Sequence, residues 1–203
     1  MSYKVGLSLL MTTFIGGSSI AQPSRIEVAL DSVAQAPVEE VKETIIEPTP
    51  EPRWVGQDFT ENEARALEFF QENGINDRMA LAVLLGNIKQ ESRFTPNICE
   101  GGARIPYASC LRGGYGLIQW TTTGRYDGLG RHARNQGTSP SGIDTQLSYL
   151  ITEREWKEAL WRFQTPGESL DFYMKGAYRW LGWGVYGNRG HFSQQYYDRL
   201  SLV

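Results

Sequence analysis

The chain has 203 residues, 40% of them apolar and 12% aromatic, which fits one globular domain with a substantial core. No run reaches the roughly 18 apolar residues that a membrane-spanning helix needs, so a spanning segment is not expected. The formal net charge is only −3 and no basic tract is interleaved with aromatics, which argues against nucleic acid as a partner.

Residues 1–21 are predicted to be a secretory signal. Lys4 supplies a positive start, Val5–Ile15 a short apolar region, and the small residues that follow end with Ser19 and Ala21 in A-x-A-like positions. We expect cleavage after Ala21. The alternatives are an uncleaved anchor and an apolar N-terminus without a role in export.

Residues 22–53 are predicted to be a disordered linker. Seven acidic residues stand against three basic ones, and EPTPEP at 47–52 favours an extended, polyproline-like chain. This segment would act as a spacer or a tether.

The folded domain is expected to span residues 54–203. Thr60 and Glu63 form a capping box, which predicts the start of a helix. Apolar residues then follow at helical spacing: Ala64, Leu67 and Phe70. Asn73–Gly74 is a left-handed stop signal and should end this helix.

The stretch Met79–Phe94 is predicted to be the central helix. Its first ten residues are apolar or small except for Asn87, and a helix that is apolar all round is normally buried. Asn76 or Asp77 can cap its start, because a short side-chain oxygen accepts from the free backbone N–H groups there.

Glu91 falls in the last turn of this helix, on the same face as Leu84 and Asn87. Partial burial and the negative end of the helix dipole would both disfavour the ionised carboxylate, which suits a proton donor near neutral pH. The alternative is a structural ion pair with Arg93 or another arginine on a solvated face.

The loop Thr95–Gly114 carries both cysteines, Cys99 and Cys110. In an exported chain they are most simply a disulfide, which would stabilise by about 2–3 kcal/mol on the chain-entropy model. A nucleophilic thiol would need a histidine partner, and His132 and His191 stand in no recognisable signature. These four residues also lack the spacing of metal ligands, so neither a metal nor a cofactor is expected.

The rest of the chain is predicted to be helical. The expected helices cover 127–135, Ile143–Phe163 with Ser141 as a cap, Ser169–Leu181 and His191–Leu200. Strand signals are scarce, and only the run Tyr115–Trp120 with its preceding loop suggests a small hairpin. The expected fold class is therefore mostly α (α+β), with at most a small β-hairpin.

Two surface features bear on the substrate. Residues 78–203 hold 15 basic and 10 acidic residues, and this excess of positive charge suits an anionic polymer such as a cell-wall glycan. An ordinary solvated surface explains it equally well. Aromatics cluster in WLGWGVYGNRGHF (180–192), where Trp183 and its neighbours would either stack on sugars or fill the core.

Two motifs carry a family resemblance. IKQESRF (88–94) and GGYGLIQWT (113–121) resemble the Glu-Ser and Gly-Leu-x-Gln pair of the lysozyme-like superfamily, which includes goose-type lysozymes and soluble lytic transglycosylases. The closer resemblance is to the phage tail lysozyme family. Its members contain segments similar to LLGNIKQES (84–92) and GYGLIQWT (114–121), and the second segment is followed by an arginine and a leucine, which are Arg125 and Leu129 here. It covers Leu67 to Leu200 and implies a lysozyme-like helical domain.

The resemblance also implies roles for individual residues. Glu91 would be the general acid that protonates the glycosidic oxygen, Gln119 would bind substrate in the groove, and Tyr115 would border the same cleft. Tyr178 in GAYRWLG would match a late tyrosine of lytic transglycosylases, although the asparagine that accompanies it there is missing.

A hydrolase of this kind pairs its acid with a second carboxylate. Glu100 in CEGGAR and Asp127 are the candidates, and each is equally explained as a solvated loop charge. Without a second carboxylate, Glu91 would act first as acid and then as base, and the sugar's own hydroxyl would attack to give an anhydro product.

The sequence therefore predicts a peptidoglycan-degrading glycosidase of the muramidase type, encoded by a phage as an endolysin or a virion component. Its partners would be glycan strands and other virion proteins, with membrane contact only in transit through the N-terminal segment. We expect it in the periplasm or cell wall, or on the virion. The alternatives are a lytic transglycosylase, a non-catalytic wall-binding or structural module, and a peptidase that cuts the cross-links.

Overall fold

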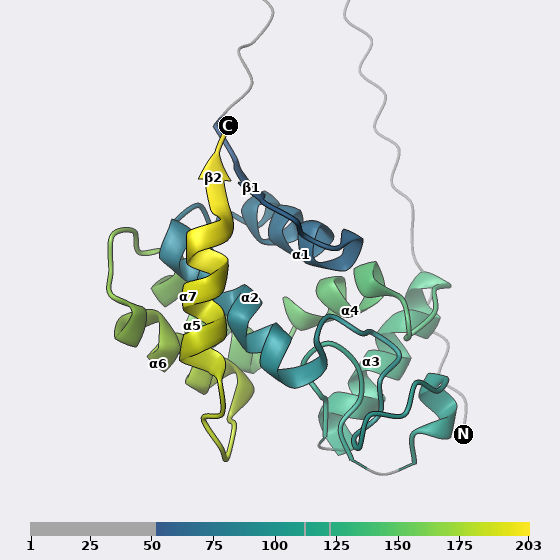
Figure 1. Cartoon of the computed structure of the whole chain (residues 1–203). Helices are drawn as coiled ribbons and strands as arrows, with labels where there is room; N and C mark the ends of the chain where they lie inside the picture. The colour runs from purple at the N-terminus through teal and green to yellow at the C-terminus, as the bar shows by residue number, and fades with distance from the viewer. Residues whose placement is uncertain (1–51, 112, 122) are drawn as a thin grey trace, which may run out of the picture. The chain divides into compact units, whose positions relative to one another are not determined.

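The computed structural model describes residues 52–111, 113–121 and 123–203. The predicted signal (1–21) and nearly all of the predicted linker (22–53) lie outside the described residues. The elements, shown in Figure 1, are β1 (Trp54–Gly56), α1 (Glu61–Glu72), α2 (Arg78–Ser92), the 3₁₀ helix η1 (Tyr107–Ser109), α3 (Thr123–Gln136), α4 (Ile143–Leu150), α5 (Arg154–Gln164), α6 (Leu170–Leu181), α7 (Arg189–Arg199) and β2 (Leu200–Leu202). The mostly α class with a small β element is confirmed.

Helix α2 is the centre of the domain, as predicted. Asp77 caps its start by accepting from the backbone N–H of Ala80 at 2.9 Å. Nine consecutive residues, 80–88, are buried, and α2 contacts α1, α5, α6 and α7. In Figure 1, α5 and α6 lie on one side of α2 and α3 and α4 on the other. None of the described helices is both long enough and apolar enough to cross a membrane.

The closest approach to α2 is made by α7. A Cβ atom added at Gly86 would lie 2.5 Å from the backbone nitrogen of Ser193 and 2.7 Å from its Cα atom. Glycine at this position therefore lets the two helices pack backbone against backbone.

Gly86→Ala is expected to lower the free energy of unfolding by about 1–3 kcal/mol, because backbone atoms must move to admit the methyl group. Urea unfolding followed by circular dichroism measures the change. Gly124→Ala in α3 is the matched control, since no atom lies within 4 Å of the added methyl group. The control should be neutral or slightly stabilising. Equal effects of the two substitutions would contradict the packing argument.

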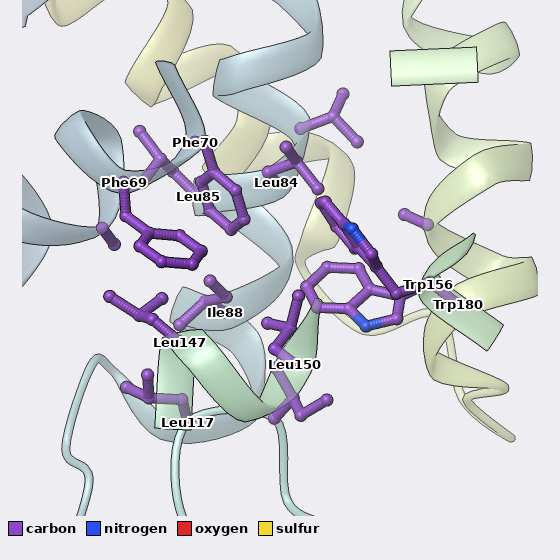
Figure 2. Close-up of a cluster of buried hydrophobic side chains, with 14 of the residues drawn as sticks. Phe69, Phe70, Leu84, Leu85, Ile88, Leu117, Leu147, Leu150, Trp156 and Trp180 are labelled. Atoms are coloured by element: carbon purple, nitrogen blue, oxygen red, sulfur yellow. The ribbon is translucent and has the colours of Figure 1, made fainter. Parts of the chain in front are cut away.

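The hydrophobic core gathers side chains from α1, α4, α5 and α6 around α2 (Figure 2). Trp156 of α5 stacks on Phe70 of α1 at 5.6 Å between ring centroids and meets Trp180 of α6 edge to face at 5.1 Å. Leu117 and the α4 residues Leu147 and Leu150 close the core from the other side. The loop that carries the second motif is thus anchored in the same core as α2.

The small β element lies elsewhere than the sequence suggests. Strand β1 pairs antiparallel with β2, with Trp54 opposite Leu202, so the sheet joins the two ends of the folded domain. The run Tyr115–Trp120 makes only an isolated bridge between Cys99 and Tyr115 and then turns. It does not continue as a strand, because Gly116 and Gln119 adopt positive φ angles of 75° and 53°.

Helix α3 begins at Thr123, four residues before the predicted start. Three glycines in GRYDGLGR (124–131) disfavour a helix. Gly128 is nevertheless helical, and its missing side chain lets α3 pack closely against α4. A Cβ atom at Gly128 would lie 2.1 Å from the hydroxyl of Tyr149 on α4.

The single helix predicted over 143–163 is two helices, α4 and α5. The chain breaks at Glu153, which is buried and accepts two hydrogen bonds from Arg125 at 2.7 and 2.8 Å. The N-cap of α4 is Gly142, and the predicted cap Ser141 bonds the hydroxyl of Tyr115 instead. Tertiary contacts override the local helical pattern at both points.

Candidate active site

Glu91 lies at the end of α2 and faces Arg189, the first residue of α7. The Arg189 Nη2 atom donates to Glu91 Oε1 at 2.5 Å. The side chains are 5% exposed for Arg189 and 15% exposed for Glu91. An arginine ion pair was the alternative that the sequence left open, but the partner is a buried arginine from α7 and not Arg93 or one on a solvated face.

Arg189 is held from three sides. Its Nη1 atom lies 3.3 Å from Asn87 Oδ1 and 3.4 Å from the Asn87 carbonyl oxygen. Its guanidinium carbon lies 4.5 Å from the centroid of the Trp183 ring, a distance typical of a cation–π contact. Asn87 and Glu91 are one helical turn apart, so both bind the same guanidinium group and fix it relative to α2.

The two sequence motifs are joined by hydrogen bonds. Ser92, which follows Glu91, donates from its hydroxyl to the carbonyl of Leu117 at 2.8 Å. Gln146 of α4 accepts from the Leu117 N–H at 2.8 Å and donates to the carbonyls of Pro96 and Pro140. The turn after Tyr115 is therefore fixed both to the end of α2 and to α4.

Gln119 is the last residue of this turn. Its φ of 53° is a left-handed conformation that costs a non-glycine residue of the order of 1–3 kcal/mol and often marks a functional site. Its amide nitrogen donates to the carbonyls of Gly116 at 3.1 Å and Ile98 at 3.4 Å. Its amide oxygen accepts no hydrogen bond within the described part of the chain, which leaves it available to a ligand.

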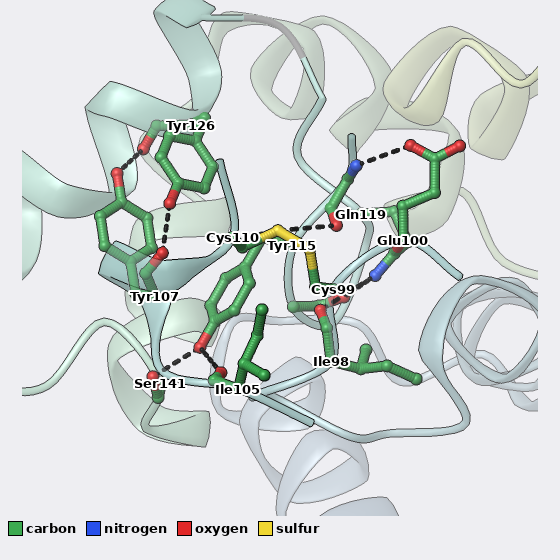
Figure 3. Close-up of a disulfide and its surroundings, with 12 residues drawn as sticks. Ile98, Cys99, Glu100, Ile105, Tyr107, Cys110, Tyr115, Gln119, Tyr126 and Ser141 are labelled. Carbon is green, nitrogen blue, oxygen red and sulfur yellow. Dashed lines mark hydrogen bonds between the residues drawn. A yellow bond between two sulfur atoms is a disulfide. The ribbon is translucent and has the colours of Figure 1, made fainter. Parts of the chain in front are cut away.

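Glu100 is held against the same turn by the preceding loop. Its backbone N–H donates to the Gly114 carbonyl at 2.8 Å, and its Oε2 atom accepts from the Gly114 N–H at 3.1 Å. The predicted disulfide joins Cys99 and Cys110, whose Cα atoms are 5.7 Å apart. Figure 3 shows the disulfide with Glu100 and Gln119 on one side of it.

These elements enclose a cleft of about 440 Å³. Glu91, Glu100 and Gln119 line it together, with Trp183 and Arg189 on the side of α6 and α7. The cleft thus offers two carboxylates, an unused amide oxygen and a large aromatic ring, which are the groups that protonate, bind and stack on a sugar.

The sequence model of the phage tail lysozyme family matches residues 61–198, from the start of α1 to the last turn of α7. The chain belongs to the phage tail lysozyme family. Membership indicates a lysozyme-like role in the degradation of peptidoglycan, carried out by a glycosidase-like enzyme that acts on the cell wall or from the virion. Both motifs that form the cleft lie within the matched residues.

Three of the predicted site residues do not line the cleft. Tyr115 is fully buried, and its hydroxyl lies 2.6 Å from Ser141 Oγ and donates to the Ile105 carbonyl at 3.2 Å. It therefore supports the turn from behind and cannot touch a ligand. Tyr178 is exposed outside the cleft and packs edge to face on Trp183 at 5.3 Å, and Asp127 lines a neighbouring groove.

Arg189 and Gln146 were not among the site residues predicted from the sequence. No local motif marks either residue, but α2 carries a signal for the first. Asn87 and Glu91 are polar residues one turn apart on the face of α2 that carries its apolar core residues, and buried polar groups need hydrogen-bond partners. Asn87 and Glu91 together therefore predict a hydrogen-bond donor from another helix or loop.

Proposed function

We propose that this domain cleaves the glycan strand of peptidoglycan, with Glu91 as the general acid. The observation that carries the proposal is the cleft that Glu91 shares with Glu100 and Gln119. General acid catalysis requires a carboxyl group within hydrogen-bond reach of the glycosidic oxygen, and a strand lying in this cleft passes Glu91.

The contact with Arg189 selects the oxygen that carries the proton. Oε1 of Glu91 accepts from Arg189, whereas Oε2 has no hydrogen bond with any described residue. A protonated carboxyl group keeps one acceptor oxygen and gains one O–H donor. The proton therefore belongs on Oε2, with Oε1 still bound to the guanidinium, and Arg189 stabilises the carboxylate that remains after transfer.

Glu100 is the second carboxylate of the proposal. It would either activate a water molecule or stabilise the cationic sugar. Its hydrogen bond from Gly114 leaves the second carboxylate oxygen for this purpose. The disulfide next to Glu100 holds the loop in place.

Gln119 and Trp183 are the proposed substrate-binding residues. The amide oxygen of Gln119 can accept from a sugar hydroxyl or an acetamido N–H, and the ring of Trp183 offers an apolar surface for a sugar face. Tyr178 would act only by supporting Trp183.

Lytic transglycosylase activity is the second candidate. It requires Glu91 to act as a base after it has given up its proton, and Oε2, which has no hydrogen bond with any described residue, is the oxygen that would take up the second proton. The two activities differ in whether water or the sugar's own hydroxyl completes the reaction.

Mass spectrometry of digested, purified peptidoglycan tests the proposal. New reducing ends indicate hydrolysis with Glu100 as partner, and anhydro-muramyl ends indicate transglycosylation. Free amino groups without glycan cleavage would identify a peptidase and overturn the proposal. Binding without any product would identify a non-catalytic wall-binding module and overturn it as well.

Arg189→Lys is expected to reduce kcat by about 10–100-fold while KM changes little. The positive charge remains, but lysine cannot contact Asn87 and Glu91 with the fixed geometry of the guanidinium group that orients Glu91. Steady-state digestion of solubilised glycan strands measures both constants. Arg199→Lys on the same helix is the control, since Arg199 bonds Gln57 and Asp58 away from the cleft. A variant with unchanged kcat would show that Arg189 does not orient the acid.

A further inference from the structure

A second groove, of about 600 Å³, lies beside the cleft. One wall is formed by Tyr107 and Tyr126, whose rings stack at 4.2 Å and whose hydroxyls each donate to the other's backbone carbonyl. Cys110 of the disulfide and the α3 residues Arg131 and Arg134 complete it. The reciprocal bonds and the disulfide fix this wall before any ligand arrives.

The groove continues the cleft. Thr121 lines both, and the neighbours Gly113 and Gly114 line the groove and the cleft respectively. Figure 3 shows the disulfide between the tyrosine pair on one side and Gln119 with Glu100 on the other. A polymer whose backbone lies in the cleft would therefore present its side branches to the groove.

The charge of the groove points to an anionic branch. Arg131 and Arg134 are exposed, and neither forms an ion pair with any residue that the structure describes. One carboxylate, Asp127, accompanies them. Two guanidinium groups and one carboxylate suit a ligand that carries more carboxylates than ammonium groups.

From this geometry we infer that the groove binds the peptide stem of peptidoglycan, with Arg131 and Arg134 on the stem carboxylates. The stems branch from the muramic acid sugars of the glycan strand and end in free carboxylates. This inference rests on the proposed function, since it places the glycan strand in the adjacent cleft. It adds that substrate recognition includes the peptide as well as the sugar.

The test compares two substrates: intact sacculi, and sacculi whose stems have been removed by an amidase that cuts after muramic acid. The full chain carries Glu91→Gln to prevent digestion, and binding is measured by sedimentation. Adding Arg131→Gln with Arg134→Gln should weaken binding to intact sacculi about tenfold, the scale expected for losing charge-assisted hydrogen bonds. Binding to stripped sacculi should stay within about twofold.

The matched control is Lys157→Gln with Lys175→Gln, which removes two positive charges from exposed positions on α5 and α6 outside the cleft and the groove. It should bind both substrates like the parent. Equal loss on intact and stripped sacculi, loss on neither, or the same loss in the control would each overturn the inference. The assay measures binding alone, so a failure of the proposed catalysis, seen as absent glycan products from the unmodified chain, is a separate outcome.

Discussion

Glu91→Gln is expected to reduce kcat on purified peptidoglycan by about 10²–10⁴-fold, the usual contribution of general acid catalysis. Glutamine keeps the shape of the side chain and an oxygen that can accept from Arg189, but the amide nitrogen that replaces Oε2 carries no acidic proton. KM should change little, because the lost interaction forms only in the transition state. Release of soluble glycan fragments, quantified by mass spectrometry, measures the effect.

Two controls make this result specific. Glu168→Gln removes an exposed carboxylate outside the cleft and should leave activity unchanged. In the Glu91 variant, a neutral amide replaces the carboxyl group that contacts buried Arg189, so a lower Tm is also expected and near-UV circular dichroism must show that the protein used is folded. A folded Glu91→Gln protein with full activity would remove Glu91 from the mechanism.

Local signals predicted the helix ends well where capping chemistry decides them. The capping box of Thr60 and Glu63 and the cap at Asp77 form as expected, because a cap depends only on residues within one turn. The apolar stretch of α2 likewise predicted its own burial. In each case, the information lies within the segment itself.

Features that depend on distant residues escaped prediction. Strand β1 pairs with β2, which lies at the opposite end of the domain in sequence. The short segments WVG and LSL carry little strand signal on their own. The family resemblance implied that Tyr115 borders the cleft, but its side chain is fully buried. Arg189 reaches Glu91 only because Gly86 and Ser193 bring α7 against α2.

A buried carboxylate, Glu63, joins the helices that carry the site. Glu63 of α1 is 3% exposed, and its Oε1 atom accepts from Lys89 Nζ at 2.9 Å and from the hydroxyl of Tyr196. Lys89 lies two residues before Glu91 on α2, and Tyr196 lies on α7, which begins with Arg189. The Glu63 network therefore ties together α1 and the two helices that meet at the cleft.

The ionisation of Glu63 makes this network sensitive to acid. Burial alone would raise the pKa of Glu63, but hydrogen bonds from Tyr196, Thr60 and Lys89 outweigh it and lower the pKa from 4.5 to about 2. Burial, together with the neighbouring Glu63 carboxylate, raises the pKa of Tyr196, so its hydroxyl remains the donor. The folded protein thus holds Glu63 ionised at a pH where the unfolded chain has already protonated it.

The stability from this group should therefore be fully present above about pH 4.5 and lost as the pH falls toward about 2. The difference between the two pKa values corresponds to about 3 kcal/mol at neutral pH. Glu63→Gln should lower the free energy of unfolding by about this amount at pH 7 and by much less near pH 2, so the two stability curves converge in acid. Urea unfolding at a series of pH values measures both curves.

Glu61→Gln is the control for charge alone, because Glu61 is exposed on the same turn of α1 and its replacement should stay within about 0.5 kcal/mol. Tyr196→Phe removes one donor and keeps the ring, so its stability should fall less than that of the Glu63 variant and should depend less steeply on pH than that of the parent. If the curves of the parent and Glu63→Gln run parallel from pH 6 to pH 2, the carboxylate is not the source of the acid sensitivity. If they converge, acid weakens the same contacts that hold α7, and with it Arg189, against the end of α2.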